Sequence, residues 1–487
     1  MPDKPRPANR VSPEHPWPRL DALLVVRLGF ALVVPALILV WSLFTLAAGQ
    51  SSTASGISHA PGGALSGDLY QAGQDGAAPT PTIEVYDPNT ATASTPTPIS
   101  EDQRAEIFDG VWSTVNENYI DPKFNGVDWA RARDEYRQRA LNATTGTDFY
   151  GALVDMVALL HDQRATFTPP GSVPMPTAGT DATGYANIGV TRAFDNNSLL
   201  VLYVYPGSPA DKADLKRRDR ITAIDGKPVT EEDRKGSALA GIVGSKVTVT
   251  VRSPGGQTRD VTLTREIVVG RAPALSRQLA EDPTVAYYGI PTLSVANIDF
   301  MTVYLLGKMH RQFLVQDMPL KGVVLDLRQT SGNSPEAMSV VLGEFTNGTL
   351  GSFESRNQAN NSDLEVPSGP LFDKFARMPL VLLVDGGTQG DAEVMAAALQ
   401  AQGRAKIVGT RTAGNTVSTA TYTWTNGRDQ SALTTPQWRF LLPDGTNIDG
   451  RGLTPDVEVS DDWTQHPEDS DPYIDAAVSL LHSMRKP

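Results

Sequence analysis

The 487-residue chain contains no cysteine, so disulfide bridges and thiolate metal ligands are both excluded. Its six histidines are scattered at positions 15, 59, 161, 310, 466 and 482, without the paired spacing of a helical zinc site. We therefore expect no metal and no other cofactor. Acidic residues outnumber basic ones by 55 to 42, and the net charge of −13 argues against a nucleic-acid partner.

Charge is also missing from residues 28–48, an apolar run long enough to span a bilayer as a helix. No Lys or Arg occurs in residues 49–103, whereas residues 1–21 are basic, and this asymmetry places the N-terminus in the cytoplasm. We interpret residues 22–48 as a transmembrane helix of the cell membrane that leaves the main domains extracytoplasmic. A signal peptide cleaved near Ala47-Ala48-Gly49 is the alternative.

The next two segments differ in composition. Residues 49–99 are rich in Ser, Thr, Ala, Gly and Pro, too polar to offset their chain entropy, and are predicted to form a flexible linker. Residues 100–170 begin with a capping-box pattern at Ser100 to Gln103 and then carry apolar residues at helical spacing. We expect an N-terminal helical region there, and a last helix after Asp471.

The order strand, turn, helix, strand is predicted for residues 379–419. An apolar run ends at the Gly-rich turn 386–390, an Ala-rich helical segment follows, and a second apolar run ends at Gly409. In an open α/β sheet, catalytic groups usually lie in the turn that leaves the carboxyl end of a strand. This turn is therefore the place to look for a nucleophile.

These residues resemble the carboxyl-terminal processing peptidases, or tail-specific proteases, of serine-lysine type. Glu393, Gly409 and Gly414 anchor the similarity, and LLPDGTNIDGRGLTPDVEV at 441–459 matches the turns that close the family's sheet. The resemblance covers residues 101–485. It implies a crotonase-like α/β core at residues 271–487 with a PDZ domain inserted at residues 180–266.

In that family the nucleophilic Ser stands three positions before the Glu, and a Lys general base with an orienting Gln follows after the next strand. Here those positions are Gly390, Asn415 and Thr419. Glycine cannot be acylated and a neutral amide cannot act as a base. The resemblance therefore implies a family member whose catalytic set is absent.

The oxyanion hole that the resemblance implies is also changed. One amide would come from the turn containing Gly332, where the family's next Gly is Asn333, and the other from Asp391, whose carboxylate disfavours developing negative charge. Asp326 and Arg328 are predicted to form local structural pairs. Asp391 and Glu393 diverge at a helix start, so a carboxylate pair for another hydrolysis is disfavoured.

The PDZ resemblance is strongest from Pro206 to Val229, although two glycines of the usual turn have become Asp214 and Arg218. PDZ domains add a peptide to a sheet edge and hold its carboxylate with backbone N–H groups. The resemblance implies that these groups come from the loop before the strand 190–193. The implied peptide-binding residues are Tyr185, Ile188, Gly189 and Val190, with Leu239 and Ile242 on a facing helix.

Three functional hypotheses remain open on the sequence. The first is a membrane-anchored protein that captures peptide or protein C-termini without hydrolysing them. The second is an active peptidase with a relocated nucleophile, for which Thr388 and Ser418 are the candidates. The third is a passive scaffold whose PDZ domain is latched onto its own core.

Overall fold

The computed structural model describes residues 99–170, 186–235, 238–256, 258–268, 275–293, 319–332, 334–426 and 429–485. The predicted cytoplasmic arm, transmembrane helix and most of the linker lie outside these residues, as does Tyr185. Within the described ranges, no helix combines the length and hydropathy needed to cross a membrane.

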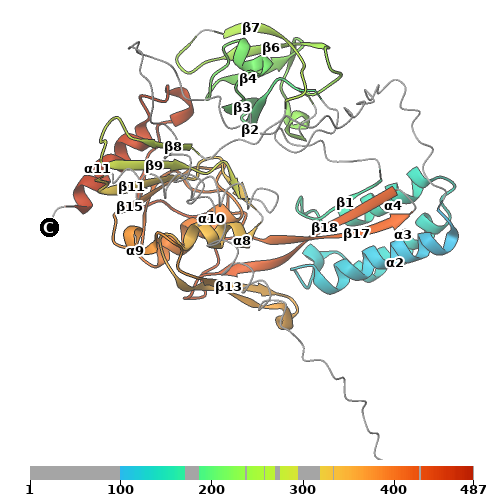
Figure 1. Cartoon of the computed structure of the whole chain (residues 1–487). Helices are drawn as coiled ribbons and strands as arrows, with labels where there is room; N and C mark the ends of the chain where they lie inside the picture. Colours follow the sequence, from blue (N-terminus) through green and yellow to red (C-terminus); the bar gives the residue numbers. More distant parts are fainter. Residues whose placement is uncertain are drawn as a thin grey trace, which may run out of the picture. The chain divides into compact units, whose positions relative to one another are not determined.

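The N-terminal region consists of α2 (Glu101–Asn118), η1 (Phe124–Gly126), α3 (Trp129–Leu141), α4 (Gly146–Ala158) and the short strand β1 (Thr166–Thr168). The predicted capping box is confirmed, because the Ser100 side chain accepts from Gln103 N while the Gln103 side chain accepts from Ser100 N. Figure 1 shows the three helices gathered along β17 (Ser418–Asn426) and β18 (Asp429–Leu441). Their apolar stripes share one core with Leu433 of β18.

The PDZ region follows as an antiparallel sheet in the order β2-β3-β4-β6-β7, with β5 beside β4. Its elements are β2 (Val190–Asp195), β3 (Ser198–Val204), α5 (Pro209–Lys212), β4 (Arg220–Ile224), β5 (Lys227–Pro228), η2 (Glu231–Lys235), β6 (Lys246–Arg252) and β7 (Thr258–Thr264). The predicted strand 220–224 is confirmed, and β2 lies at an edge of the sheet.

The α/β core is a six-stranded sheet in the order β19-β16-β15-β11-β9-β8, parallel except for the β8–β9 pair. Its strands are β8 (Leu275–Gln278), β9 (Val285–Gly289), β11 (Gly322–Asp326), β15 (Leu380–Val384), β16 (Lys406–Gly409) and β19 (Val457–Glu458). The β11 and β15 residues are apolar at almost every position, as expected for strands covered on both faces.

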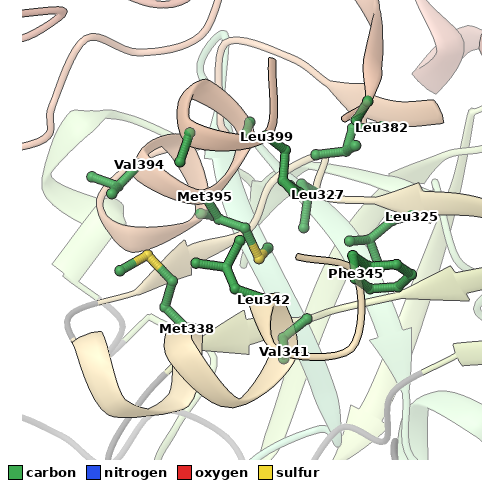
Figure 2. Close-up of a cluster of buried hydrophobic side chains, with 14 of the residues drawn as sticks. Leu325, Leu327, Met338, Val341, Leu342, Phe345, Leu382, Val394, Met395 and Leu399 are labelled. Atoms are coloured by element: carbon green, nitrogen blue, oxygen red, sulfur yellow. The ribbon is translucent and has the colours of Figure 1, made fainter. Parts of the chain in front are cut away.

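Helices cover the two faces of this sheet. On one face, α8 (Pro335–Leu342) and α10 (Asp391–Ala401) pack against alternate residues of β11 and β15, and Figure 2 shows Met395 and Leu399 of α10 in this core. On the other face, α11 (Pro472–Met484) packs against the intervening residues, such as Val381 and Leu383. The predicted terminal helix and the predicted strand, turn, helix, strand order are therefore confirmed.

A second sheet of the core runs in the order β1-β18-β13-β14, with β17 paired to β18. It adds β13 (Gly348–Ser355), η6 (Gln358–Asn360) and β14 (Ser362–Val366), and α9 (Phe372–Phe375) packs in the core that β13 and β14 share. The turn η7 (Trp463–Gln465) instead packs with α11 on the other face of the six-stranded sheet. A two-residue parallel pair joins β10 (Thr292–Leu293) to β12 (Ser331–Gly332). Because β1 belongs to this sheet, the PDZ region is an insertion between two parts of the core.

The PDZ region is joined to the core by buried charges. Arg218 is 1% exposed, and its guanidinium bonds the Asp471 carboxylate at 2.5 Å. Asp471 in turn accepts from Arg328, which pairs with Asp326. The predicted local pairing of Asp326 and Arg328 is confirmed, whereas the link to Arg218 was not predicted.

Candidate functional site

The loop that should carry a nucleophile begins at the carboxyl end of β15. Asp385, the first residue after this strand, is buried and accepts from Gln329 N and Gln329 Nε2, both at 2.9 Å, and from Gly387 N at 3.0 Å. Burial raises the pKa of the Asp385 carboxyl above its usual value, although these donors oppose the shift. The hydrogen bonds tie the loop after β15 to the loop after β11.

Gly390 occupies the nucleophile position in a left-handed conformation, with φ 63° and ψ −136°, as the residue before α10. A Cβ atom placed there would lie less than 3.0 Å from the Gly332 carbonyl oxygen, a separation that real Cβ atoms essentially never show. The backbone of the neighbouring loop thus fills the space that a serine side chain would need. The geometry suits glycine only.

Asn415, at the position of the family's general base, is held by hydrogen bonds to the loop that contains Gly390. Asn415 donates from its side-chain amide to Gln389 Oε1 at 3.2 Å, and its backbone carbonyl accepts from Gly390 N at 2.8 Å. Glu393 binds the same turn, because it accepts from Gly414 N at 2.8 Å and Asn415 N at 2.9 Å. The turn is anchored by these contacts, with an amide where the family places an amine.

Thr419, at the position of the orienting Gln, lies near the start of β17 opposite Pro436. It is partly buried and belongs to the β17–β18 ladder. A threonine at this place has a shorter side chain than glutamine. The position therefore contributes a strand residue to the sheet.

The two residues predicted at the oxyanion hole, Gly332 and Asp391, both form structural hydrogen-bonded contacts. Gly332 pairs with Leu293 in the short β10–β12 ladder. The Asp391 carboxylate, 2% exposed, accepts from Ser334 N. Burial raises the pKa of Asp391 to about 6, and the negative charge of Glu336 acts in the same direction. Asp391 thus ties the backbone of Ser334, the N-cap of α8, to the start of α10.

The two candidates for a relocated nucleophile are placed differently. Thr388 is fully buried, and its hydroxyl donates to the Leu327 carbonyl at 2.8 Å while accepting from Asp385 N at 3.0 Å. Ser418 starts β17 opposite Trp438. The predicted divergence of Asp391 and Glu393 is confirmed, since Asp391 binds Ser334 N and Glu393 binds the turn at 412–415.

The predicted peptide-binding residues lie at the start of β2. Ile188 is buried in the PDZ core, and its carbonyl accepts from Ala210 N at 2.8 Å. Gly189 has φ 80°, and a Cβ there would meet the Ser208 side chain. Val190 begins β2 and is 5% exposed. The structure therefore brings these three residues together at the edge of the sheet.

The predicted helix carrying Leu239 and Ile242 is wrong. Residues 238–244 form turns and an isolated bridge between Gly241 and Ala186, and the nearest helical turn is η2. Gly241 and Gly244 both disfavour helix, and Gly244 has φ 78°. Leu239 is 4% exposed and packs in the PDZ core, whereas Ile242 is 50% exposed.

Three large apolar side chains are exposed beside this loop. The side chains of Ile242, Val243 and Ile267 are each about half exposed. They come just after Gly241 and Glu266, whose backbones form bridges to Ala186 and Asn187 in the loop that precedes β2. Exposed apolar residues that gather in this way mark interaction surfaces. The start of β2 therefore has an apolar rim.

A small cavity separates the PDZ sheet from the core. Its lining includes Thr191 and Tyr203 of the PDZ sheet together with Ile290, Asp326 and Gln329 of the core. One face of β2 is thus turned toward the loop that precedes Gly332. In the described parts of the chain, no group of three His, Asp or Glu side chains could hold a metal ion.

The fold and the loop arrangement define an α/β peptidase scaffold with an inserted PDZ domain. Peptidase family S41 matches residues 300–459, the tricorn protease C1 domain matches residues 100–158, and a PDZ domain matches residues 200–253. The first match lies in the α/β core, the second in the N-terminal helices and the third in the inserted PDZ sheet.

Curated relatives identify the family. The chain is 30% identical over 368 residues to carboxyl-terminal-processing peptidase 2, chloroplastic, of Arabidopsis thaliana, covering 72% of this chain and 68% of that protein. It is 24% identical to the carboxyl-terminal-processing protease of a Synechocystis strain, covering 80% and 89%. A solved photosystem II D1 C-terminal processing protease matches with a TM-score of 0.54 and 25% identity, covering 73% and 93%. The chain belongs to the carboxyl-terminal processing peptidase family.

Proposed function

We propose that this protein captures the free carboxyl ends of peptides or proteins through its PDZ domain and does not hydrolyse them. The observation that carries the proposal is the Gly332 carbonyl oxygen in the space of a nucleophile side chain at Gly390. Catalysis of acyl transfer by this family's mechanism needs an attacking oxygen and a base, and Gly390 and Asn415 provide neither. The carboxylate of Asp391 beside the oxyanion position acts in the same direction.

Retained peptide binding is supported by the PDZ region. The β2 strand is at a sheet edge, and a peptide can extend the sheet there through main-chain hydrogen bonds. The apolar rim of Ile242, Val243 and Ile267 lies beside the loop that precedes β2. A peptide end would bury apolar surface against this rim while its main chain pairs with β2.

The expected setting is the extracytoplasmic side of the cell membrane, with residues 22–48 as the anchor. This part of the proposal rests on the uncharged run 28–48 and the basic segment before it. Protease added outside intact cells should remove a C-terminal tag from the full chain while the N-terminus stays protected. A tag released into the medium without added protease would instead indicate a cleaved signal peptide.

Binding is tested with two pools of octapeptides that have the same randomised last four residues. One pool has free carboxylates and the other has C-terminal amides. The full chain in detergent should retain the first pool and release the second. Equal retention of the two pools, or of neither, would contradict capture of C-termini.

A matched pair of variants locates the site. Ile242→Asp places a carboxylate on the apolar rim, and it should weaken retention of the free-carboxylate pool. Val154→Asp changes an exposed apolar residue of α4, far along the chain in the helical region, and should leave retention unchanged. Equal effects of the two variants would place the binding surface elsewhere.

A scaffold with a latched PDZ domain is the second candidate, because Arg218 is buried in contacts with the core. A docked PDZ domain can still bind a peptide at β2. The two candidates are separated by the pool experiment, since a pure scaffold retains neither pool.

A further inference from the structure

The edge strand β2 presents one arginine to the place where a peptide would lie. The β2–β3 register shifts between Thr191 and Arg192, but Val190 and Arg192 pair with Val204 and Val201 of β3, which both belong to the PDZ-core side. Val190, Arg192 and Phe194 therefore share one face. Val190 and Phe194 of this set pack against the PDZ core, whereas Thr191 on the other face lines the cavity toward the protease core. Arg192 therefore lies on the PDZ side of the edge, between two apolar neighbours.

Arg192 has no ion pair or hydrogen-bonded acceptor among the described residues. Asp233 of η2 attracts Arg192 through space, with no hydrogen bond or ion pair between the two side chains. The Asp233 carboxylate instead accepts from Thr230 N at 2.8 Å and from Thr230 Oγ1 at 3.2 Å. Burial lowers the pKa of Arg192 and the negative charge of Asp233 opposes this shift, although an arginine stays charged in any case. A partly desolvated cation of this kind gains from an anionic partner.

The other cations around this edge already have partners. Arg234 of η2 covers the Phe194 ring at 4.8 Å and pairs with Glu231. Arg265 donates to the Leu239 carbonyl at 3.1 Å, and Arg220 binds Asp195 at 2.6 Å. Within the part of the chain that the structure describes, Arg192 thus differs from these arginines in having no hydrogen-bonded or ion-paired partner for its guanidinium.

The register of an added strand identifies what Arg192 would meet. A peptide that pairs antiparallel with β2, with its carboxylate at the loop ending in Gly189, places its last residue opposite Val190. Its third residue from the carboxyl end then stands opposite Arg192. Directly opposite side chains share one face, with Cβ atoms about 5 Å apart.

We propose that Arg192 selects peptides with an acidic side chain at the third residue from the carboxyl end. The inference rests on the proposed function and names the ligand class of that site. Aspartate or glutamate at this position forms a charge-assisted pair with Arg192, and the guanidinium fork can bind both oxygens of the carboxylate. A lysine at the same position is repelled.

The test uses the full chain in detergent and the free-carboxylate octapeptide pool, with retained peptides sequenced by mass spectrometry. Aspartate and glutamate should be enriched at the third position from the end. Arg192→Gln should abolish this enrichment, and Arg192→Glu should replace it with enrichment of lysine and arginine. Arg192→Lys keeps the charge and should keep part of the acidic preference, which a merely structural role would not predict.

Arg252→Gln is the matched control, because Arg252 is an exposed arginine of the same domain at the end of β6. It should retain the wild-type preference. Two peptides that differ only by Glu or Gln at the third position from the end should then differ about 10-fold in affinity for the wild type, as one charge-assisted bond predicts. The difference should disappear in Arg192→Gln.

The outcomes separate this inference from the proposed function. Retention of the pool without an acidic preference at that position, or a preference that survives in Arg192→Gln, overturns the role of Arg192 and leaves C-terminal capture standing. Failure to retain any free-carboxylate peptide overturns both. A thermal melt of each variant checks that the domain stays folded.

Discussion

Replacing Arg218 by glycine should loosen the PDZ domain from the core, although it removes an unfavourable backbone conformation. Arg218 has φ 73°, in the left-handed region, and stands where PDZ domains of this family usually have glycine. A non-glycine residue there costs about 1 kcal/mol. If the backbone alone mattered, Arg218→Gly would stabilise the protein.

The side chain outweighs this cost. Its Nη1 faces the carbonyl oxygens of Trp463, His466 and Pro467 at 3.2, 2.9 and 3.0 Å, and its Nη2 binds Asp471 at 2.5 Å. Removing one partner of a buried ion pair costs about 3–5 kcal/mol. Asp471 keeps Arg328 as a partner in the variant, but the carbonyl oxygens of residues 463, 466 and 467 also lose their donor. Subtracting the backbone gain leaves a net loss of about 2–4 kcal/mol for docking of the PDZ domain.

Asp214→Gly is the matched control. Asp214 also has a left-handed φ, of 58°, and also replaces a family glycine, but its side chain is exposed and forms its ion pair with the exposed Lys216 rather than with the core. Aspartate tolerates this conformation better than most residues. Asp214→Gly should therefore change docking by less than about 0.5 kcal/mol.

The assay is amide hydrogen exchange in residues 463–471 of the purified full chain. Arg218→Gly should speed exchange there by roughly 30- to 700-fold relative to the wild type, as about 2–4 kcal/mol corresponds to. Asp214→Gly should match the wild type. Unchanged exchange in Arg218→Gly, or equal acceleration in both variants, would refute the view that Arg218 fastens the PDZ domain.

Three further predictions concern the core. Gly390→Ser should destabilise the fold by more than about 3 kcal/mol in chemical denaturation, because the added Cβ meets the Gly332 carbonyl oxygen. It should restore no peptidase activity, even when combined with Asn415→Lys. The control Gly386→Ala, in the same loop but with open space around the added Cβ, should be close to neutral in the same assay. Asp391→Ala should lower the free energy of unfolding by about 1–3 kcal/mol, because Ser334 N loses its buried acceptor. Glu336 is exposed and accepts only from the Ser334 hydroxyl in this contact, so Glu336→Ala should lower it by less than about 0.5 kcal/mol. Glu344 is buried, with no ion pair to a cation among the described residues, and burial raises its pKa to about 7. Folding therefore favours its protonated form, so the stability it contributes is complete below about pH 4.5 and is lost as the pH rises through about 7. Glu344→Gln should thus match the wild type at pH 4.5 and exceed it by roughly 2–3 kcal/mol at pH 8, and a constant difference across this range would contradict the assignment.

Local patterns predicted much of the fold. The strand at 220–224, the capping box at Ser100 and the final helix after Asp471 follow from periodicity and end signals that involve only neighbouring residues. The place of the candidate site followed from the turn after an apolar strand. These features depend on short segments of chain, so a sequence is sufficient to predict them.

The contacts that decide the site join distant segments. Arg218 and Asp471 are 253 residues apart, and the Gly332 carbonyl reaches Gly390 from another loop. The local spacing of apolar residues does not show which distant residues will come into contact. One signal was present in the sequence, because Arg218 and Asp214 both replaced turn glycines, and only one of the two side chains reaches across to the core.

The helix predicted around Leu239 and Ile242 failed for a local reason. The two apolar residues have helical spacing, but Gly241 lies between them and uses its backbone to bridge Ala186. The spacing of the two apolar residues fits a helix only by chance, because the backbone between them pairs with the loop that precedes β2. Glycine content was the better guide to this segment.

Binding without hydrolysis is tested most directly by following the retained free-carboxylate octapeptides during long incubation with the purified full chain. Intact peptides recovered by mass spectrometry, bound in proportion to active PDZ sites, are the predicted result. Progressive cleavage that copurifies with the chain and is lost in Thr388→Ala or Ser418→Ala would show that a hydroxyl elsewhere in the fold performs the hydrolysis.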